Sequence, residues 1–89
     1  MITLANNSKT YTVQYNSLDG NRYEITATKE GYSKYRIKKY LLETEDNIER
    51  PIQQVINVNG KAYHSMLAKD QNCMKTWIWN YVDNDEKRD

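Results

Sequence analysis

One segment of the sequence concentrates cations and tyrosines, the residue types that hold nucleic acids. Residues 29–40 read KEGYSKYRIKKY, with five Lys or Arg, one Glu and three Tyr. Cations neutralise phosphates, and aromatic rings offer faces on which unpaired bases stack. The segment therefore predicts a binding site for RNA or single-stranded nucleic acid, in which cations hold phosphates and Tyr35 stacks on a base. The side chains expected to form it are Lys34, Tyr35, Arg36, Lys38 and Lys39.

A second group of aromatic residues lies near the C-terminus, where residues 76–82 read TWIWNYV. Exposed Trp and Tyr are typical anchors of protein interfaces, and an edge strand can pair with a partner. Trp77, Trp79 and Tyr81 therefore support an alternative function, a protein-interaction module or inhibitor that binds a protein target or a second copy of itself. The competing interpretation is that both tryptophans pack in the core.

Residues suited to catalysis or metal binding are few. The chain has one histidine, His64, and one cysteine, Cys73. A Cys–His pair without a third orienting group is weak evidence for nucleophilic catalysis. With Asp70 added, these residues still supply too few soft ligands for a closed zinc site. We therefore expect no enzyme activity, no cofactor and no metal.

Carboxylates cluster in residues 43–49, which read ETEDNIE. Acid catalysis requires a buried carboxylate with a raised pKa beside a second one. The neighbours here are polar, so we interpret the cluster as a solvated acidic loop. A weak cation site or a patch for a basic partner are the alternatives.

The net charge of +1 conceals an asymmetry along the chain. Residues 1–42 carry seven Lys or Arg against three acids, a balance of +4, while residues 43–89 carry six against nine, a balance of −3. Such a low total is unusual for a dedicated nucleic-acid-binding domain, so a merely solvated basic face competes with the binding hypothesis. The sequence is polarised rather than uniformly neutral.

The 89 residues suffice for one small domain with a modest core. We expect this domain to span residues 1–82, followed by a polar, frayed tail over residues 83–89. The sequence shows no apolar run of membrane-spanning length, and we expect no secretion leader; one cysteine suits a reducing compartment. These features predict a cytoplasmic protein that does not bind membranes.

The composition, with ten Asn, nine Lys and no Phe, resembles that of small accessory proteins from AT-rich phages and mobile elements. Such proteins often block host machinery. The resemblance implies an inhibitor or an antitoxin-like component of a ribonucleoprotein complex.

Two hairpins must position these residues. Alternating apolar residues on both sides of Leu18–Gly20 predict a three-residue loop, which pairs Tyr15 with Tyr23 and Val13 with Ile25. Asn59-Gly60 predicts a two-residue turn that pairs Ile56 with Tyr63. Continued along the same register, this second hairpin pairs Ile52 with Leu67 and Gln54 with Ser65.

The remaining two segments fit both regular structures. From about Ser33 to Leu42 an apolar stripe predicts a helix, because a strand would turn Lys39 inward. Thr76–Val82 contains strong strand formers and predicts a C-terminal strand, because a helix would leave Trp79 on the wrong side. The expected fold is therefore α+β, a small antiparallel sheet with one helix in the order ββ-α-ββ-β. The alternative is an all-β six-stranded meander or small barrel.

Overall fold

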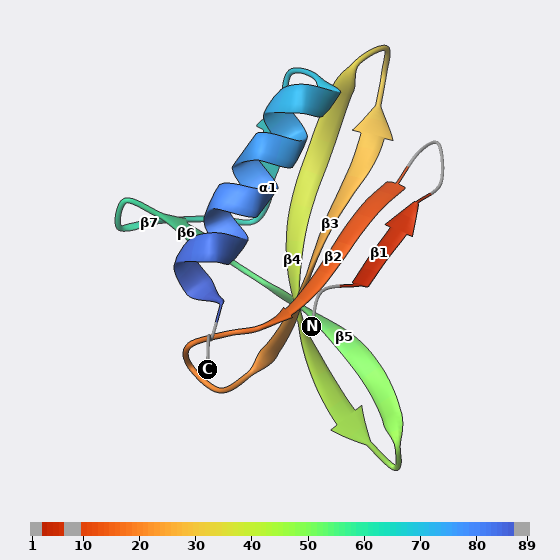
Figure 1. Cartoon of the computed structure of the whole chain (residues 1–89), viewed down its shortest axis with the longest axis vertical. Coiled ribbons are helices and arrows are strands. Elements are labelled where there is room, and N and C mark those ends of the chain that lie inside the picture. The colour runs from red at the N-terminus through yellow and green to blue at the C-terminus, as the bar shows by residue number, and fades with distance from the viewer. Residues whose placement is uncertain (1–2, 7–9, 87–89) are drawn as a thin grey trace.

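The computed structural model describes residues 3–6 and 10–86, which form eight strands followed by one helix (Figure 1). The strands are β1 (Thr3–Asn6), β2 (Thr10–Asn16), β3 (Arg22–Glu30), β4 (Lys34–Glu45), β5 (Ile48–Gln54), β6 (Ile56–Val58), β7 (Lys61–Tyr63) and β8 (Met66–Ala68). The helix, α1, spans Gln71–Asp85. The predicted α+β class, with one helix and an antiparallel sheet, is confirmed.

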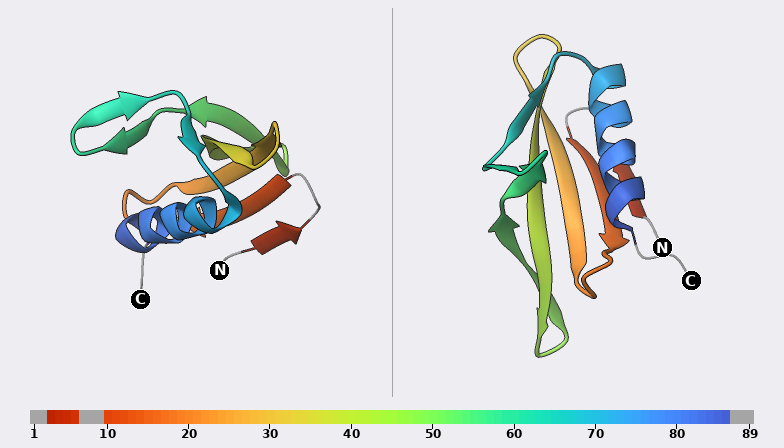
Figure 2. Two further views of the ribbon diagram at one scale, coloured as in Figure 1. Left: turned by 90° about the horizontal axis from the view of Figure 1, so that it is seen from above. Right: turned by 90° about the vertical axis from the view of Figure 1, so that its left-hand side faces the viewer.

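The main sheet is antiparallel and has the order β1-β2-β3-β4-β5, with β8 also paired to β4. β4 is long enough to pair with two strands along one edge, β5 over Lys39–Glu45 and β8 over Tyr35–Ile37. β6 and β7 form a separate small hairpin between β5 and β8. Figure 2 shows α1 against one face of the main sheet, with the β6–β7 hairpin extending to the side. The sheet therefore has an inner face toward α1 and an outer face away from it.

The first hairpin adopts the predicted register. Tyr15 pairs with Tyr23 and Val13 with Ile25. The Ser17 backbone N–H donates to the Asn21 carbonyl at 2.8 Å, and Gly20 takes a φ of +90°. Glycine accepts this left-handed conformation without steric cost, which allows the three-residue loop to close in this register.

The second hairpin is shorter than predicted. Its Asn59-Gly60 turn and its pairing of Ile56 with Tyr63 are confirmed. The expected continuation is wrong, because Ile52 pairs instead with Leu41 of β4 and Leu67 with Arg36. The long strand β4 pairs with both segments along one edge, β5 toward its C-terminal end and β8 toward its N-terminal end.

The helix expected from Ser33 to Leu42 is wrong, because this segment forms β4. Tyr35, Ile37 and Lys39 alternate inward and are buried, while the residues between them are only partly buried. The inward Lys39, which weighed against a strand at the level of sequence, is accommodated by polar partners on α1 described below.

The C-terminal strand expected over Thr76–Val82 is also wrong, because these residues belong to α1. Asp70 caps the helix through a 2.7 Å hydrogen bond from the Cys73 backbone N–H to Asp70 Oδ1. Trp79, which seemed misplaced on a helix, donates from Nε1 to the Tyr11 hydroxyl on β2 at 2.9 Å. The helix also excludes the all-β alternative.

The core lies between the inner face of the sheet and one stripe of α1. Its fully buried side chains include Val13, Tyr15, Ile25, Ile37, Ile56, Met74, Ile78 and Val82. Three of these, Met74, Ile78 and Val82, are spaced four residues apart along α1 and so share one side of the helix. The packing of this stripe on the sheet, rather than intrinsic propensity, selects the helix.

The predicted domain boundary after Val82 is too early. α1 continues through Asp85, and Glu86 forms a bridge with Ser17. Residues 83–86 are therefore part of the fold, while residues 87–89 of the expected tail lie outside the described residues. Within the part of the chain that the structure describes, no helix is long and apolar enough to cross a membrane.

Truncation of the helix stripe tests this packing. We expect Ile78→Ala to lower the free energy of unfolding by about 2–5 kcal/mol, because the side chain is fully buried and its loss leaves a cavity. Ile48→Ala, at a side chain that is 57% exposed on β5, should cost under about 1 kcal/mol. Urea unfolding of both variants measures the difference, and equal losses would contradict the assigned core.

Candidate functional site

The predicted nucleic-acid segment is divided between the two faces of the sheet. Tyr35 and Lys39 point inward and are only 9% and 8% exposed. Lys34, Arg36 and Lys38 alternate with them and point to the outer face. The sequence predicted one binding site made of all five residues, but the structure divides them between two faces of the sheet. Burial rules out base stacking by Tyr35 and removes Lys39 from the row of phosphate contacts.

The outer face carries the remaining cations in a row along β4. Alternate side chains of a strand are about 6.6–6.8 Å apart on one face. Tyr40 continues this row beyond Lys38 and is half-buried. None of the outward-facing residues of β2, β3 and β4 within the described residues is buried, so this face is open.

Within residues 3–6 and 10–86, Arg36 is the one cation of the row that forms an ion pair. Its Nη2 and Nε atoms lie 3.0 and 3.1 Å from the two carboxylate oxygens of Glu30, and its Nη1 donates to Ser65 Oγ at 3.1 Å. The hydrogen bonds from Arg36 lower the pKa of Glu30. This exposed, forked pair fixes the orientation of the guanidinium relative to Glu30.

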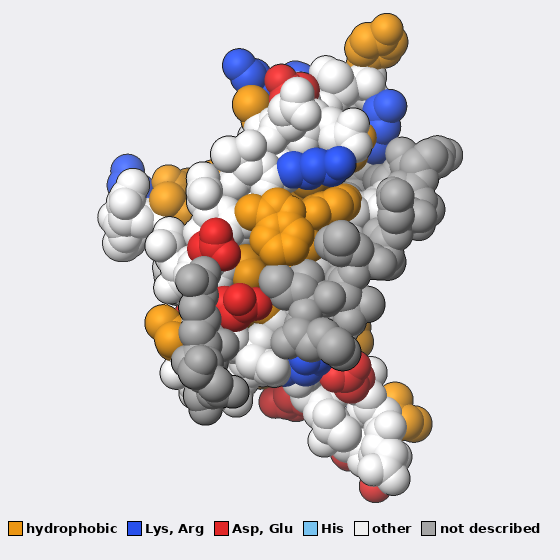
Figure 3. Space-filling model, in the orientation of Figure 1, with side chains coloured by type: hydrophobic (Ala, Val, Ile, Leu, Met, Phe, Trp, Pro, Cys, Tyr) orange, Lys and Arg blue, Asp and Glu red, His pale blue; other side chains and the backbone are white. Residues whose placement is uncertain are grey.

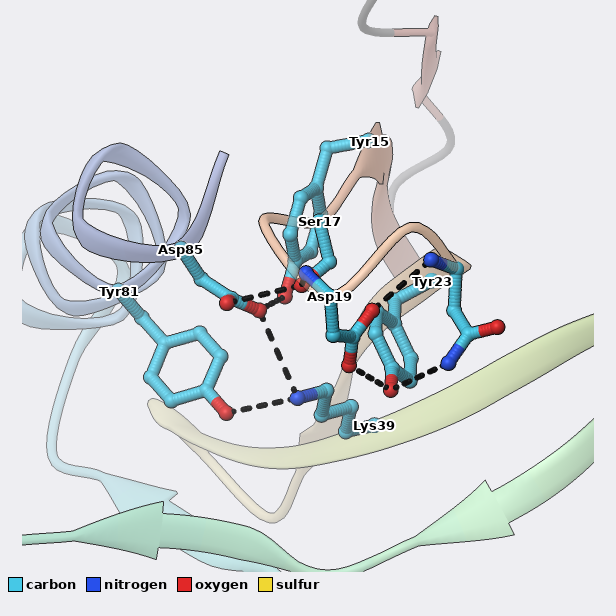
Figure 4. A network of polar contacts seen from close by, with 8 residues as sticks. Tyr15, Ser17, Asp19, Tyr23, Lys39, Tyr81 and Asp85 are labelled. Atoms are coloured by element: carbon cyan, nitrogen blue, oxygen red, sulfur yellow. Dashed lines mark hydrogen bonds and ion pairs between the residues drawn. The ribbon is translucent and has the colours of Figure 1, made fainter. Parts of the chain in front are cut away.

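On the inner face, Lys39 is the centre of a polar network (Figure 4). Its Nζ donates to the Tyr81 hydroxyl at 2.9 Å and lies 3.8 Å from Asp85 Oδ2. The same ammonium lies 4.1 Å from the centre of the Tyr23 ring, a cation–π contact. A charge buried in the sheet is thus compensated by a carboxylate, a hydroxyl and an aromatic face.

Asp85 connects this network to the first hairpin. Tyr15 donates to Asp85 Oδ2 at 2.6 Å, and Ser17 Oγ donates to Oδ1 at 2.9 Å. The Leu18 backbone N–H donates to the Asp85 carbonyl at 2.8 Å. Burial, and then the bond to Asp85, raise the pKa of Tyr15 far above its ordinary value, so Tyr15 stays a donor at any physiological pH.

A second carboxylate, Asp19, organises the loop of the first hairpin. Tyr23 donates to Asp19 Oδ2 at 2.7 Å, and the Asn21 backbone N–H donates to Oδ1 at 2.8 Å. The hydrogen bond from Tyr23 is the main cause of the lowered pKa of Asp19. Burial, followed by the bond to Asp19, raises the pKa of Tyr23. The loop is therefore held in place beside Lys39.

The aromatic group of α1 does not form the predicted exposed strand edge. Trp77 and Tyr81 lie one turn apart and stack, with ring centres 5.1 Å apart and planes 13° apart. Trp79 lies against Tyr11 instead. All three are partly buried and pack against the core, as the competing interpretation proposed. Only Trp77 and Tyr81 share a surface.

That surface is one wall of an open pocket with a volume of about 600 Å³. The C-terminal half of α1, the inner side of β4, the β5–β6 segment and the first hairpin loop surround it. Lys39, Asp19 and Asp85 bring charge to the wall, and amide side chains such as Asn57, Asn80 and Asn84 line most of the remainder. The pocket can donate and accept hydrogen bonds from several directions.

His64 and Cys73 lie outside this pocket. His64 is exposed after β7, and Cys73 is an exposed free thiol in the first turn of α1. Among residues 3–6 and 10–86, no three His, Cys, Asp or Glu side chains gather in a way that would hold a metal ion.

Comparison with protein-family models, with curated proteins and with solved structures finds no match for this chain. The two features of the molecule that bear on its function are therefore the outer row of cations and the inner pocket. The sequence indicated the first but missed the second. In the sequence, the only sign of the pocket was that Lys39 would point inward if its segment were a strand. Asp19 and Asp85 gave no such sign, because they lie in a turn and in a polar tail, where acidic residues are common.

Removal of Asp85 tests the inner network. We expect Asp85→Ala to lower the free energy of unfolding by about 3 kcal/mol, because it leaves Lys39 buried without its counter-ion and removes the acceptor of Tyr15 and Ser17. Lys39→Met should cost under about 1 kcal/mol, because it removes the more deeply buried charge, while Asp85, whose side chain is 30% exposed, keeps its bonds from Tyr15 and Ser17.

A double-mutant cycle with urea unfolding separates these effects. Asp85→Ala should cost at least about 1 kcal/mol less in the Lys39→Met background than in the natural chain. Glu43→Ala, an exposed acid of β4, serves as the control and should change stability by less than about 0.5 kcal/mol. Additive losses in the cycle would show that Lys39 and Asp85 are not coupled.

The Asp19–Tyr23 bond predicts a pH effect with a defined sign. Because the pKa of folded Asp19 lies below its ordinary value of 3.8, the bond stabilises the fold above about pH 4 and is lost as the pH falls through the folded pKa. Tyr23→Phe removes the main cause, so the pKa of Asp19 should rise toward 3.8. Carboxyl NMR titration measures this. Tyr32→Phe, at an exposed ring, should leave it unchanged.

Proposed function

We propose that this chain is a binding protein without catalytic activity that holds RNA or single-stranded nucleic acid on the outer face of its sheet. The observation that carries the proposal is the row of three cations, Lys34, Arg36 and Lys38, on one open face of β4. Successive phosphates of an extended single strand are spaced comparably with alternate side chains of a β-strand. A nucleic-acid strand lying along β4 would thus meet one cation per phosphate.

The three cations would contribute unequally. Arg36 already donates two hydrogen bonds to Glu30, so a phosphate that binds it must compete with that carboxylate. In the described part of the chain, neither Lys34 nor Lys38 forms an ion pair with a carboxylate. The two lysines would supply the larger share of the phosphate binding.

Tyr40 takes the stacking role that the sequence assigned to Tyr35. It follows Lys38 on the same face, and it is half-buried, so part of its ring remains accessible. Tyr40 pairs with Gln53 of β5, so it lies next to β5 on the outer face. A base that stacks there would leave its phosphate within reach of Lys38.

Size and composition suggest the setting in which such a protein would act. We place it in the cytoplasm, as a phage-type inhibitor or antitoxin-like component of a ribonucleoprotein complex. The exposed, unpaired thiol of Cys73 supports a reducing compartment.

A charge-matched pair of variants tests the row. We expect Lys34→Ala/Lys38→Ala to weaken binding to a single-stranded oligouridylate and to reduce the slope of log K against log salt by about 1.4, or 0.7 per lost contact. Fluorescence anisotropy over a salt series measures both quantities. Lys61→Ala/Lys75→Ala removes the same charge from β7 and α1 and should change the slope little. The proposal fails if the natural chain does not bind, or if both double variants behave alike.

A further inference from the structure

The pocket on the inner side of the sheet is separate from the outer row of cations. Its volume of about 600 Å³ lies within the 300–1,000 Å³ usual for small-ligand sites. Its wall is built from segments distant in sequence, the first hairpin loop, β4, the β5–β6 segment and α1. A cavity assembled in this way keeps its shape only while the whole fold is intact, which suits a preformed ligand site.

The charge of the wall argues against an anionic ligand. Among the lining residues, Asp19 and Asp85 oppose the single cation Lys39, an excess of one negative charge. The pocket also lies beside the C-terminal end of α1, where the backbone carbonyls add partial negative charge and no basic residue offsets it. Figure 3 shows acidic side chains beside this end of the helix. A phosphorylated or carboxylated ligand would be repelled.

Lys39 nevertheless has hydrogen-bonding capacity left for a neutral ligand. An ammonium has three N–H donors. Within the described residues, one donates to Tyr81 at 2.9 Å, while Asp85 at 3.8 Å lies beyond hydrogen-bond distance. Lys39 is one of the residues that line the pocket, so a ligand oxygen that reaches its ammonium can accept a hydrogen bond from an N–H that Tyr81 does not occupy.

The rest of the wall presents donors, acceptors and apolar carbon together. The amides of Asn57, Asn80 and Asn84 each carry an N–H₂ donor and a carbonyl acceptor, and the Asp19 carboxylate only accepts. Trp77 and Val58 add apolar surface to the same wall. A ligand that matches this wall needs groups that both donate and accept, set on a compact frame that also presents C–H surface.

We propose that this pocket binds an uncharged sugar ring. Each hydroxyl of a sugar donates one hydrogen bond and accepts others, which matches a wall that contains amide, ammonium and carboxylate groups. The C–H faces of the ring match Trp77 and Val58. Lys39 donates to a ring hydroxyl oxygen, and Asp19 accepts from a hydroxyl at the mouth.

The test uses the full-length chain and neutral sugars as probes. Glucose, galactose, mannose, N-acetylglucosamine and ribose are each titrated to about 50 mM, which detects millimolar dissociation constants. We expect at least one to shift the NMR signals of the Asn80 and Asn84 side-chain amides. Glucose 6-phosphate should bind more weakly than glucose. Adenosine, compared with ribose, tests whether the pocket recognises a nucleobase rather than a sugar ring.

Matched variants on one helix locate the binding. Asn80→Ala and Asn84→Ala should each weaken the sugar at least fivefold, while Asn72→Ala, exposed in the first turn of α1, should not. The proposal is overturned if no sugar shifts these signals, if glucose 6-phosphate or adenosine alone binds, or if all three variants bind equally. Lys34→Ala/Lys38→Ala should leave sugar binding unchanged, so this result is independent of nucleic-acid binding.

Discussion

The burial of one lysine within an otherwise apolar sheet face is the constraint around which this structure is organised. An ammonium in the interior is tolerated only with charged and hydrogen-bonding partners close by. Lys39 obtains them from α1, through Asp85 at 3.8 Å and Tyr81 at 2.9 Å. The helix must therefore extend to Asp85 and lie across β4 in one orientation. Tyr15 and Ser17 fix Asp85 from the opposite side, so the lysine, the helix end and the first hairpin are held together.

The same alternation that buries Lys39 creates the open row of cations. In a strand, neighbouring residues point to opposite faces, so a run of basic residues is divided between the two. Lys34, Arg36 and Lys38 remain on the outer face because Tyr35, Ile37 and Lys39 point toward the helix. Neither face of β4 therefore carries all of the cations that stand close together in the sequence. The two proposed sites, one for a polyanion and one for a neutral ring, lie on opposite sides of a single strand.

Local sequence determined some of this structure and not the rest. The hairpin registers were predictable, because Gly20 and Asn59-Gly60 define turns whose effects extend over a few residues. The prediction placed a helix where β4 lies and a strand where α1 lies, because the apolar residues of each segment fit both the helical and the strand period. What distinguishes them are contacts between distant residues, such as the bond from Tyr15 to Asp85, 70 positions apart. One sequence does not show which distant residues meet. The fold class could therefore be predicted from local patterns, but the pocket, which distant segments form together, could not.

The presence of a lysine at this position is not explained by stability. A buried ion pair commonly gains no more than an apolar pair of similar size, because removing both charges from water offsets their attraction. A methionine at position 39 would pack against Tyr23 and Tyr81 without that penalty. A lysine does what methionine cannot, since its ammonium keeps N–H donors beyond the one bonded to Tyr81 while Asp85 balances its charge. The network is therefore better understood as the support of the proposed sugar site than as reinforcement of the core.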